Sequence, residues 1–214
     1  MLRLWYGLMA KSKSSGRWLR EHFNDEFVKK AQKEGYRSRA TYKLLEIQQK
    51  DKIFRPGDVV VDLGAAPGGW AQFAVKQVGR KGRVYALDLL AIDPIEGVDI
   101  IQGDFSEECA YQSLMACLVG QQVDLVISDM APNISGMRSV DQPKMVYLGE
   151  LAVAFAEQVL KTRGIFLAKM FQGEGVEELY QVLRQRFSQV ITRKPKASRA
   201  RSREVYILAK GYKL

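Results

Sequence analysis

The sequence predicts an α/β fold, with one mostly parallel sheet of seven strands, an antiparallel last strand and helices on both faces. Three observations lead to this prediction. Short β-branched runs alternate with longer amphipathic segments along the chain, a pattern typical of parallel sheets with crossover helices. The first buried run leads into a glycine-rich turn and a helix-like segment, the usual entry of a ligand-binding α/β domain. The last two strand-like runs are joined by only Pro195 to Ser202, too short a link for a parallel crossover, so this pair must be antiparallel.

The expected elements follow in order along the chain. A basic helical region at about 17–33 and a helix at about 39–49 come first. The alternating part supplies strands near 58–62, 83–87, 97–101, 123–128 and 164–169, and helices near 69–78, 106–118, 143–161 and 174–187. Final strands near 189–194 and 203–210 complete the sheet. We expect residues 1–16 to form a flexible basic extension and residues 17–214 to form a single domain.

Composition narrows the class of protein. With 214 residues, 47% of them hydrophobic, the chain can form one α/β domain with a sizeable core. It holds no run of eighteen apolar residues, so no membrane span or membrane partner is expected. Cys109 and Cys117 lie eight positions apart on a predicted helix, about 12 Å along its axis, which is too far for a disulfide. Two free thiols fit a reducing compartment, and we expect a cytoplasmic monomer.

Positive charge is concentrated at the two ends of the chain. The net charge is +9, and residues 1–50 hold 12 Lys and Arg against 5 Asp and Glu, while residues 184–214 hold 10 against 1. The middle, residues 51–183, is acidic, with 11 against 18. Basic ends around an acidic centre are typical of a protein that binds a polyanion. The competing interpretation is a basic surface kept for solubility.

The turn after the first buried strand predicts a bound adenosine group. The strand Val59–Leu63 is followed by Gly64 and Gly68, and Asp88 ends the second strand twenty residues after Gly68. Glycine lets the backbone approach a ligand closely, and an acidic residue at this distance is where a nucleotide ribose is held. The plainer interpretation is an ordinary turn with a solvent-facing aspartate.

The same turn favours S-adenosylmethionine over a dinucleotide. The middle glycine of the dinucleotide pattern is replaced by Ala66, and Pro67 removes a backbone N–H that a phosphate would need. Asp62 adds a negative charge at the strand end, which disfavours a nearby phosphate. A ligand with an ammonium group and no phosphate suits this site better. A nicotinamide-dependent oxidoreductase remains the alternative, and it is distinguished by which cofactor the protein binds.

Ionisable residues lie at the ends of three predicted strands, at one edge of the sheet. Asp129 follows strand 123–128, Lys169 ends strand 164–169, and Glu204 lies at the start of the last strand. Because the last strand runs opposite to the others, all three residues converge at the same edge. Each could instead be a solvated strand-end charge, although Lys169 lies within an apolar run. The single histidine, His22, and two separated cysteines supply no zinc-ligand set, so no metal is expected.

Five motifs spread over the chain carry a family resemblance. They are Arg37–Leu44, Asp62–Trp70, Ser128–Asn133, Lys169–Gly175 and Ser198–Glu204. With them the chain resembles the FtsJ/RrmJ family of ribose 2′-O-methyltransferases of large-subunit ribosomal RNA, from about Arg17 onward. The resemblance implies a Rossmann-like, S-adenosylmethionine-dependent methyltransferase fold, with residues 17–214 as the catalytic domain.

The resemblance also implies roles for individual residues. The family's catalytic tetrad falls in order on Lys43, Asp129, Lys169 and Glu204, and Lys169 is the group that contacts the reacting 2′-hydroxyl. The sequence leaves open whether Lys169 removes the hydroxyl proton or orients the oxygen as a cation. Asp88 would hold the ribose of the cofactor and Asp104 the adenine edge. The remaining cofactor residues would be Gly68, Asp129 and Trp70, although Trp70 could equally be a packing residue at a helix start.

The resemblance implies that the partner is ribosomal RNA within the large subunit and that the target is a uridine of the A-loop. Transfer RNA and organellar ribosomal RNA are substrates of related branches. We expect arginines near both ends to contact the RNA, namely Arg37, Arg39, Arg199, Arg201 and Arg203. Amino-group methylation of a base usually requires an aromatic residue after the fourth strand, and cytosine C5 methylation requires a cysteine there; the run Asp129–Asn133 has neither. A non-catalytic RNA chaperone is the rival of another class, and a methyl-transfer assay separates it from the enzyme.

Overall fold

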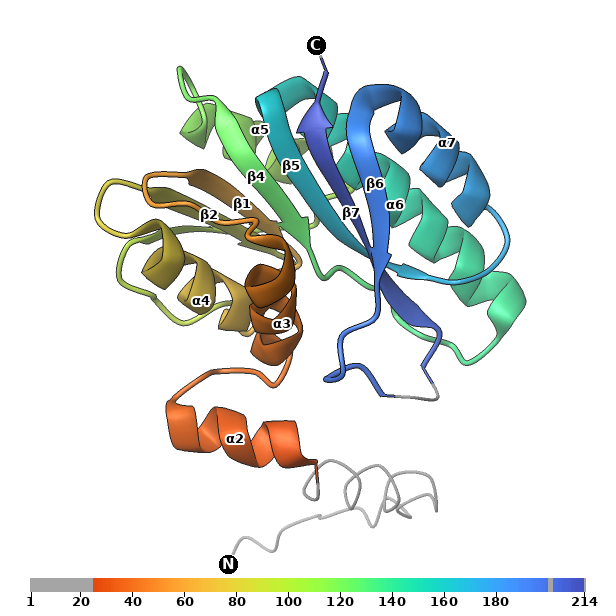
Figure 1. Cartoon of the computed structure of the whole chain (residues 1–214), viewed down its shortest axis with the longest axis horizontal. Helices are drawn as coiled ribbons and strands as arrows, with labels where there is room; N and C mark the ends of the chain where they lie inside the picture. The colour runs from red at the N-terminus through yellow and green to blue at the C-terminus, as the bar shows by residue number, and fades with distance from the viewer. Residues whose placement is uncertain (1–24, 200–201, 214) are drawn as a thin grey trace, which may run out of the picture.

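The computed structural model describes residues 25–199 and 202–213. The predicted extension at 1–16, the first part of the predicted helix 17–33 and Arg201 lie outside these residues. Figure 1 shows one twisted sheet with helices on both sides. Its strands are β1 (Val59–Leu63), β2 (Arg83–Asp88), β3 (Val98–Gln102), β4 (Val123–Ser128), β5 (Leu160–Phe171), β6 (Phe187–Arg193) and β7 (Glu204–Tyr212). The helices are α2 (Glu26–Glu34), α3 (Thr41–Asp51), α4 (Gly69–Val78), α5 (Glu108–Cys117), α6 (Arg138–Val159) and α7 (Val176–Arg186).

The sheet has the strand order β3-β2-β1-β4-β5-β7-β6. Strands β1 to β5 pair in parallel, and β7 runs antiparallel to both of its neighbours, β5 and β6. This confirms the predicted fold class. The chain order reverses between β1 and β4, and ligands of such sheets bind at this switch point, beyond the carboxyl ends of the strands.

The side chains of alternating strand residues pack into two hydrophobic layers, one on each side of the sheet. The larger layer packs the sheet against α5, α6 and α7 and includes Phe155, Phe166 and Leu183. The other packs it against α3 and α4 and includes Leu44 and Trp70. Among the helices described between Glu26 and Arg186, none has the length and apolar character needed to cross a bilayer.

Most element boundaries agree with the predictions, and α6 is the main exception. It begins at Arg138, five residues before the predicted start, and it carries Pro143 inside the helix. The side chain of Asp141 organises the approach to this helix, because it accepts hydrogen bonds from the backbone N–H groups of Ser135 (2.8 Å) and Gly136 (3.0 Å). Strand β5 is also longer than predicted, at twelve residues.

The turn after β1 is packed tightly against the chain that follows β4. Gly64 has a φ of +75°, and a Cβ atom added there would lie 2.8 Å from the backbone of Met130. Only glycine fits this close approach. The N–H of Gly64 donates to the carbonyl of Leu87 (2.9 Å), and the N–H of Asp129 donates to that of Leu63 (3.1 Å). The tips of β1, β2 and β4 are therefore fixed relative to one another.

Candidate active site

Two lysine–carboxylate pairs meet at the carboxyl edge of the sheet. The Nζ atom of Lys43 lies 2.7 Å from Oε1 of Glu204, and the Nζ atom of Lys169 lies 3.1 Å from Oδ1 of Asp129. Lys169 also donates to the backbone carbonyl of Asp129. The structure thus brings together the four residues of the predicted tetrad, from α3, β5, β7 and the end of β4.

The hydroxyl of Tyr206 joins the two pairs. It donates to Oδ1 of Asp129 (2.7 Å) and accepts from Nζ of Lys43 (3.1 Å). Burial, and then the negative charges of Asp129 and Glu204, raise the pKa of Tyr206 well above its usual value, so the hydroxyl keeps its proton. Sequence reasoning missed this residue. Its spacing from Glu204 was the available signal, because residues two apart on a strand share one face.

Strand periodicity places the tetrad on the side of the sheet covered by α3. Leu167, Tyr206 and Leu208 belong to the layer under α3 and α4, and Lys169 and Glu204 are each two positions from one of them, on the same face. The side chains of the tetrad are only 9% to 18% exposed. Charges so little exposed interact more strongly than they would in water.

Asp129 is held as a carboxylate. Its burial acts to raise its pKa, but the positive charges of Lys169 and Lys43 and the hydrogen bond from Tyr206 outweigh this, and the pKa of Asp129 is lowered. A negative charge therefore stands between the two lysines at neutral pH. This arrangement can hold a polar group such as a hydroxyl through the lysine ammonium groups, which donate but do not accept hydrogen bonds.

A cavity of about 610 Å³ opens at the switch point and reaches Asp129. This volume is within the ordinary range for small-molecule sites. The tips of β1, β2 and β4 contribute Gly64, Asp88 and Asp129 to its wall, and the segment after β3 contributes Asp104. Asp88 is fixed by the N–H groups of Ala66 (2.9 Å) and Leu90 (2.8 Å). Hydrogen bonds from the hydroxyl and N–H of Ser106 lower the pKa of Asp104.

The charges around this cavity suit a cationic, phosphate-free ligand. Asp62 is fully buried, and neither of its carboxylate oxygens has a hydrogen-bond partner. Its burial, followed by the nearby charges of Asp129 and Asp88, raises its pKa well above the usual value. Asp88 and Asp129 thus lie in the cavity wall, and a positive charge bound beside them would be attracted to their carboxylates and would favour ionisation of Asp62. The residues present fit S-adenosylmethionine, which carries a sulfonium and an ammonium group. Across residues 25–199 and 202–213, no three His, Cys, Asp or Glu side chains gather as metal ligands.

Two residues predicted to touch the cofactor do not line this cavity. Trp70 is buried, its indole N–H donates to the carbonyl of Ala40 (2.8 Å), and its ring packs on Tyr206 at 5.7 Å. This is the packing position that the sequence left open for it. Gly68 has a φ of +100°, and a side chain there would meet Ile95 at 2.7 Å and Arg37 at 3.1 Å. Contact of either residue with the cofactor stays a prediction.

The predicted RNA-binding arginines have different surroundings. Arg37 donates to the carbonyls of Asp93 (2.6 Å) and Pro94 (2.8 Å), and Arg39 pairs with Asp25 (2.6 Å) and donates to the carbonyl of Ala197. Both thereby tie protein segments together. Arg199 and Arg203 are partly exposed beside the tetrad strand β7. RNA binding by these arginines stays a prediction.

Known proteins similar to this chain are methyltransferases. The profile of the FtsJ-like methyltransferase family matches residues 36–212. A protein of Marinobacter nauticus is 59% identical over 96% of this chain and 100% of its own length, and one of Alkalilimnicola ehrlichii is 58% identical over 97% and 100%. Both are named ribosomal RNA large subunit methyltransferase E.

Solved structures agree with this assignment. A crystal structure from Plasmodium falciparum, described as that of a ribosomal RNA methyltransferase, superposes with a TM-score of 0.74 at 29% identity, covering 83% of this chain and 98% of that one. The matched profile spans every strand of the sheet and all four tetrad residues. The chain belongs to the FtsJ-like methyltransferase family.

Proposed function

We propose that this protein transfers the methyl group of S-adenosylmethionine to a ribose 2′-hydroxyl of large-subunit ribosomal RNA. One observation carries the proposal: Asp129 belongs both to the ion-pair cluster and to the wall of the cofactor cavity. A hydroxyl held by the lysines would therefore lie next to the cofactor. The names of the 55–59% identical relatives support ribosomal RNA as the substrate.

Lys169 is the residue we assign to the reacting hydroxyl. When bound, S-adenosylmethionine supplies an electrophilic methyl group, so the protein mainly needs to align the attacking oxygen. Two contacts of the Lys169 ammonium go to Asp129, one to its carboxylate and one to its carbonyl. An ammonium group has three donors, which leaves one for the hydroxyl oxygen. Removal of the hydroxyl proton by Lys169 requires that the ammonium first lose a proton of its own.

The other cluster residues hold Lys169 and the substrate in place. Lys43 and Glu204 form a second pair that Tyr206 connects to Asp129. Deleting any member would change the hydrogen bonds of the next, so we assign them to positioning. Asp88 and Asp104 are assigned to the ribose hydroxyls and the adenine edge of the cofactor, which their place in the cavity wall supports.

The specific substrate we propose is a uridine of the A-loop in the assembled large subunit, whose methylation supports ribosome maturation. Basic residues at both ends of the chain support binding to a large folded RNA. Partly exposed Arg199 and Arg203 lie next to the cluster, where they can contact backbone phosphates.

The test is methyl transfer from labelled S-adenosylmethionine to large subunits isolated from cells that lack this protein. A 2′-O-methyl group blocks alkaline cleavage of the following phosphodiester, so the label should appear in an alkali-resistant dinucleotide that contains uridine. Label on a base would contradict ribose methylation. Transfer to naked RNA but not to subunits would contradict the proposed substrate state. RNA binding without any transfer would favour the chaperone interpretation.

A further inference from the structure

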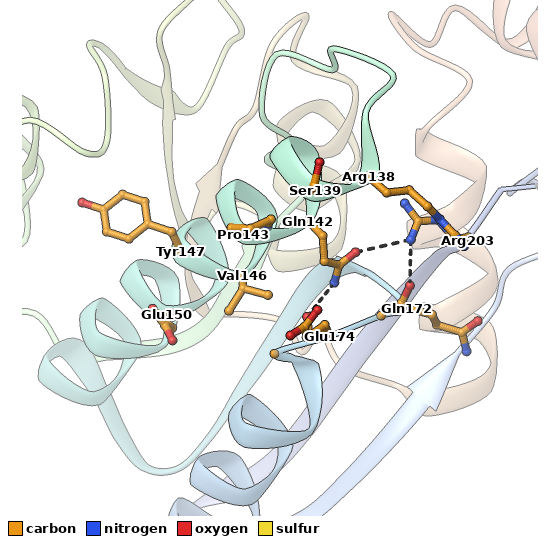
Figure 2. Close-up of a pocket in the computed structure, with 12 residues that line it drawn as sticks. Arg138, Ser139, Gln142, Pro143, Val146, Tyr147, Glu150, Gln172, Glu174 and Arg203 are labelled. Carbon is orange, nitrogen blue, oxygen red and sulfur yellow. Dashed lines mark hydrogen bonds between the residues drawn. The ribbon is translucent and has the colours of Figure 1, made fainter.

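A second cavity, of about 740 Å³, lies beside the ion-pair cluster and takes no part in the proposed methyl transfer. Figure 2 shows it between the first turns of α6, the segment after β5 and Arg203. The cofactor cavity lies on the other side of α6, and Tyr147 borders both.

The wall of this cavity is continuous with the tetrad strands. Phe171 pairs with Glu204 at the end of the β5–β7 ladder. The next residue of each strand, Gln172 and Arg203, lines the cavity, and the N–H of Gln172 donates to the carbonyl of Arg203 (3.0 Å). Gln172 and Arg203 are each an odd number of positions from Lys169 or Glu204, so the cavity lies on the α6 side of the sheet and the tetrad on the α3 side, and both reach the carboxyl edge. An RNA strand that crosses this edge from the tetrad would bring a neighbouring nucleotide to the cavity.

One end of the cavity is cationic. Arg138 and Arg203 both line it, and in the view of Figure 2 their side chains are directed toward the same part of the cavity wall. The Nη1 atom of Arg203 donates to the carbonyl of Gln172 (3.2 Å) and to Oε1 of Gln142 (3.5 Å). Gln142 is itself anchored, since its amide nitrogen donates to the carbonyls of Phe171 and Glu174, each at 3.0 Å. The guanidinium of Arg203 is thus oriented, and two arginines on the wall of one cavity suit a phosphate.

The rest of the cavity presents hydrogen-bond acceptors and flat surfaces. Pro143 has no N–H, so it cannot donate to the carbonyl of Ser139, one turn earlier on the same wall. Glu150 and Glu174 add carboxylates. Pro143 and Tyr147, the latter 51% exposed, offer surfaces on which a base can stack. This mixture of donors and acceptors fits a nucleotide better than a free anion.

Two residues that line the cavity, Arg138 and Pro143, are unfavourable for the start of helix α6. Arg138 places a cation in the first turn, where the helix dipole disfavours it. Pro143 removes a backbone hydrogen bond inside the helix. Departures from local sequence rules are expected where a residue serves function, and both of these departures face the same cavity.

We infer that this cavity holds one unpaired nucleotide of the substrate RNA, adjacent in the strand to the methylated nucleotide. Its phosphate lies at Arg138 and Arg203, and its base lies along the Pro143–Tyr147 face, with amino groups directed to the Ser139 carbonyl and Glu150. The inference rests on the proposed function, because it takes the tetrad as the place of the target ribose.

The test measures the affinity of the full-length protein for unmethylated large subunits by filter binding, with saturating S-adenosylmethionine, at several salt concentrations. Arg138→Ala should weaken binding on the order of tenfold and reduce the slope of log affinity against log salt by about 0.7 to 0.9 for the lost phosphate contact. Tyr147→Leu should weaken binding on the order of tenfold through lost stacking, while Tyr147→Phe should bind like the wild type. The matched control is Arg80→Ala, an exposed arginine of the acidic middle segment that lies before β2, at the amino edge of the sheet, and it should leave affinity and slope unchanged.

The inference is overturned if Arg138→Ala and Tyr147→Leu bind the subunits as tightly as Arg80→Ala. Calorimetry with S-adenosylmethionine checks Tyr147→Leu for damage to the cofactor cavity. Arg138 does not line that cavity, so its variant decides the matter if Tyr147→Leu is damaged. If wild-type protein binds subunits but leaves no ribose methyl group, the proposed function fails, and the affinity comparison still reports on the cavity.

Discussion

The two ends of α3 both carry a charged residue that pairs with the antiparallel end of the sheet, but the two pairings are built differently. At the beginning of the helix, Lys43 pairs with Glu204 of β7. At its end, Asp51 pairs with Arg193 of β6 and lies 3.8 Å from Lys210 of β7. The amount of burial does not separate them, since the side chains are 11% and 15% exposed at the first site and 5% and 19% exposed in the Asp51–Arg193 pair.

Hydrogen-bond geometry does separate them. Each oxygen of Asp51 has its own guanidinium nitrogen, at 2.7 and 2.8 Å, and Lys210 donates to the Asp51 carbonyl (2.7 Å). At the other end, lysine ammonium groups and one tyrosine hydroxyl share their partners. An arginine fork fixes one geometry, whereas an ammonium group is a point charge on a flexible stem. The contact at the end of α3 is therefore held in one geometry, whereas the contact at its beginning could exchange partners, as our proposal that a substrate hydroxyl enters this network requires.

The largest expected effect is on the rate of methyl transfer, through the lysine–carboxylate pairs near the beginning of α3. Lys169→Ala should reduce single-turnover methyl transfer by about 10²- to 10⁴-fold, because the group that contacts the reacting oxygen is lost. Cofactor affinity measured by calorimetry should stay within about twofold. The matched control is Lys210→Ala, which removes the lysine beside Asp51 at the end of α3 and should leave the transfer rate unchanged. Transfer by Lys169→Ala at the wild-type rate would refute the assignment.

The pH dependence of the transfer rate then shows whether Lys169 acts as a base or as a cation. If Lys169 is a base, the wild-type rate should rise with pH through one ionisation, and Lys169→Arg, which stays charged, should lose that step and most of its activity. Substantial activity in Lys169→Arg without a change in the pH profile would show that the charge alone suffices.

The second largest effect is on the stability of the protein, through the Asp51–Arg193 pair at the end of α3. Asp51→Asn should lower the free energy of unfolding by about 2 to 3 kcal/mol, because Arg193 loses its charged partner. Hydrogen bonds from Arg193, and then its charge, outweigh burial and lower the pKa of Asp51 below 3.8 in the folded state. The stabilisation is therefore full above about pH 5 and is lost progressively as pH falls through the unfolded and then the folded pKa. Urea unfolding at pH 7 and pH 3 should show the difference from wild type shrinking in acid.

The control for this measurement is Glu177→Gln, which breaks an exposed pair with Arg184. It should change stability by no more than about 0.5 kcal/mol. A stability difference for Asp51→Asn that grows in acid would contradict a lowered pKa for Asp51 in the folded state.

A smaller effect should come from the hydroxyl that joins the two lysine pairs. Tyr206→Phe keeps the ring on Trp70 but removes the hydroxyl donor of Asp129, which then has only Lys169. A hydrogen bond to a charged group is worth about 1.5 to 3 kcal/mol, so the single-turnover rate should fall by about tenfold to 100-fold. An unchanged rate would show that the pairs act independently.

The smallest expected effect comes from exchanging the fork for a point charge. Arg193→Lys keeps the charge beside Asp51 but cannot bond both oxygens in the same way, so stability should fall by about 1 kcal/mol. Thermal unfolding at neutral pH is the measurement. A loss equal to that of Asp51→Asn would mean that geometry, rather than charge, supplies the whole of this contact.

Periodicity and strand ends predicted the sheet and the meeting of Asp129, Lys169 and Glu204, whereas Lys43, inside α3, was implied only by the family resemblance. Asp129 and Lys169 follow apolar runs whose order places β4 and β5 side by side. The start of α6 was predicted too late, at about 143, because proline is most often found in the first turn of a helix, and here Pro143 is inside it. Tyr206 was missed because a tyrosine inside an apolar strand usually belongs to the core.

Contacts between distant segments could not be predicted in this way. Arg37 donates to carbonyls 56 and 57 positions away, and nothing in its own neighbourhood indicates that. A count of positive charges cannot tell an arginine that holds a loop from one that faces RNA. The cavity beside Arg138 likewise depends on the turn after β5 folding back on α6.

The separation of the site residues along the chain has a consequence for biosynthesis. The cofactor cavity is built from residues up to Leu148, whereas Tyr206 is 77 positions beyond Asp129 and 163 beyond Lys43. At a synthesis rate of about 5 to 20 residues per second, roughly 4 to 15 seconds pass between Asp129 and Tyr206. During that interval the nascent chain lacks the strand that completes the tetrad. If the tetrad is the catalytic site that we propose, methyl transfer therefore cannot begin until the last strand of the sheet has been synthesised.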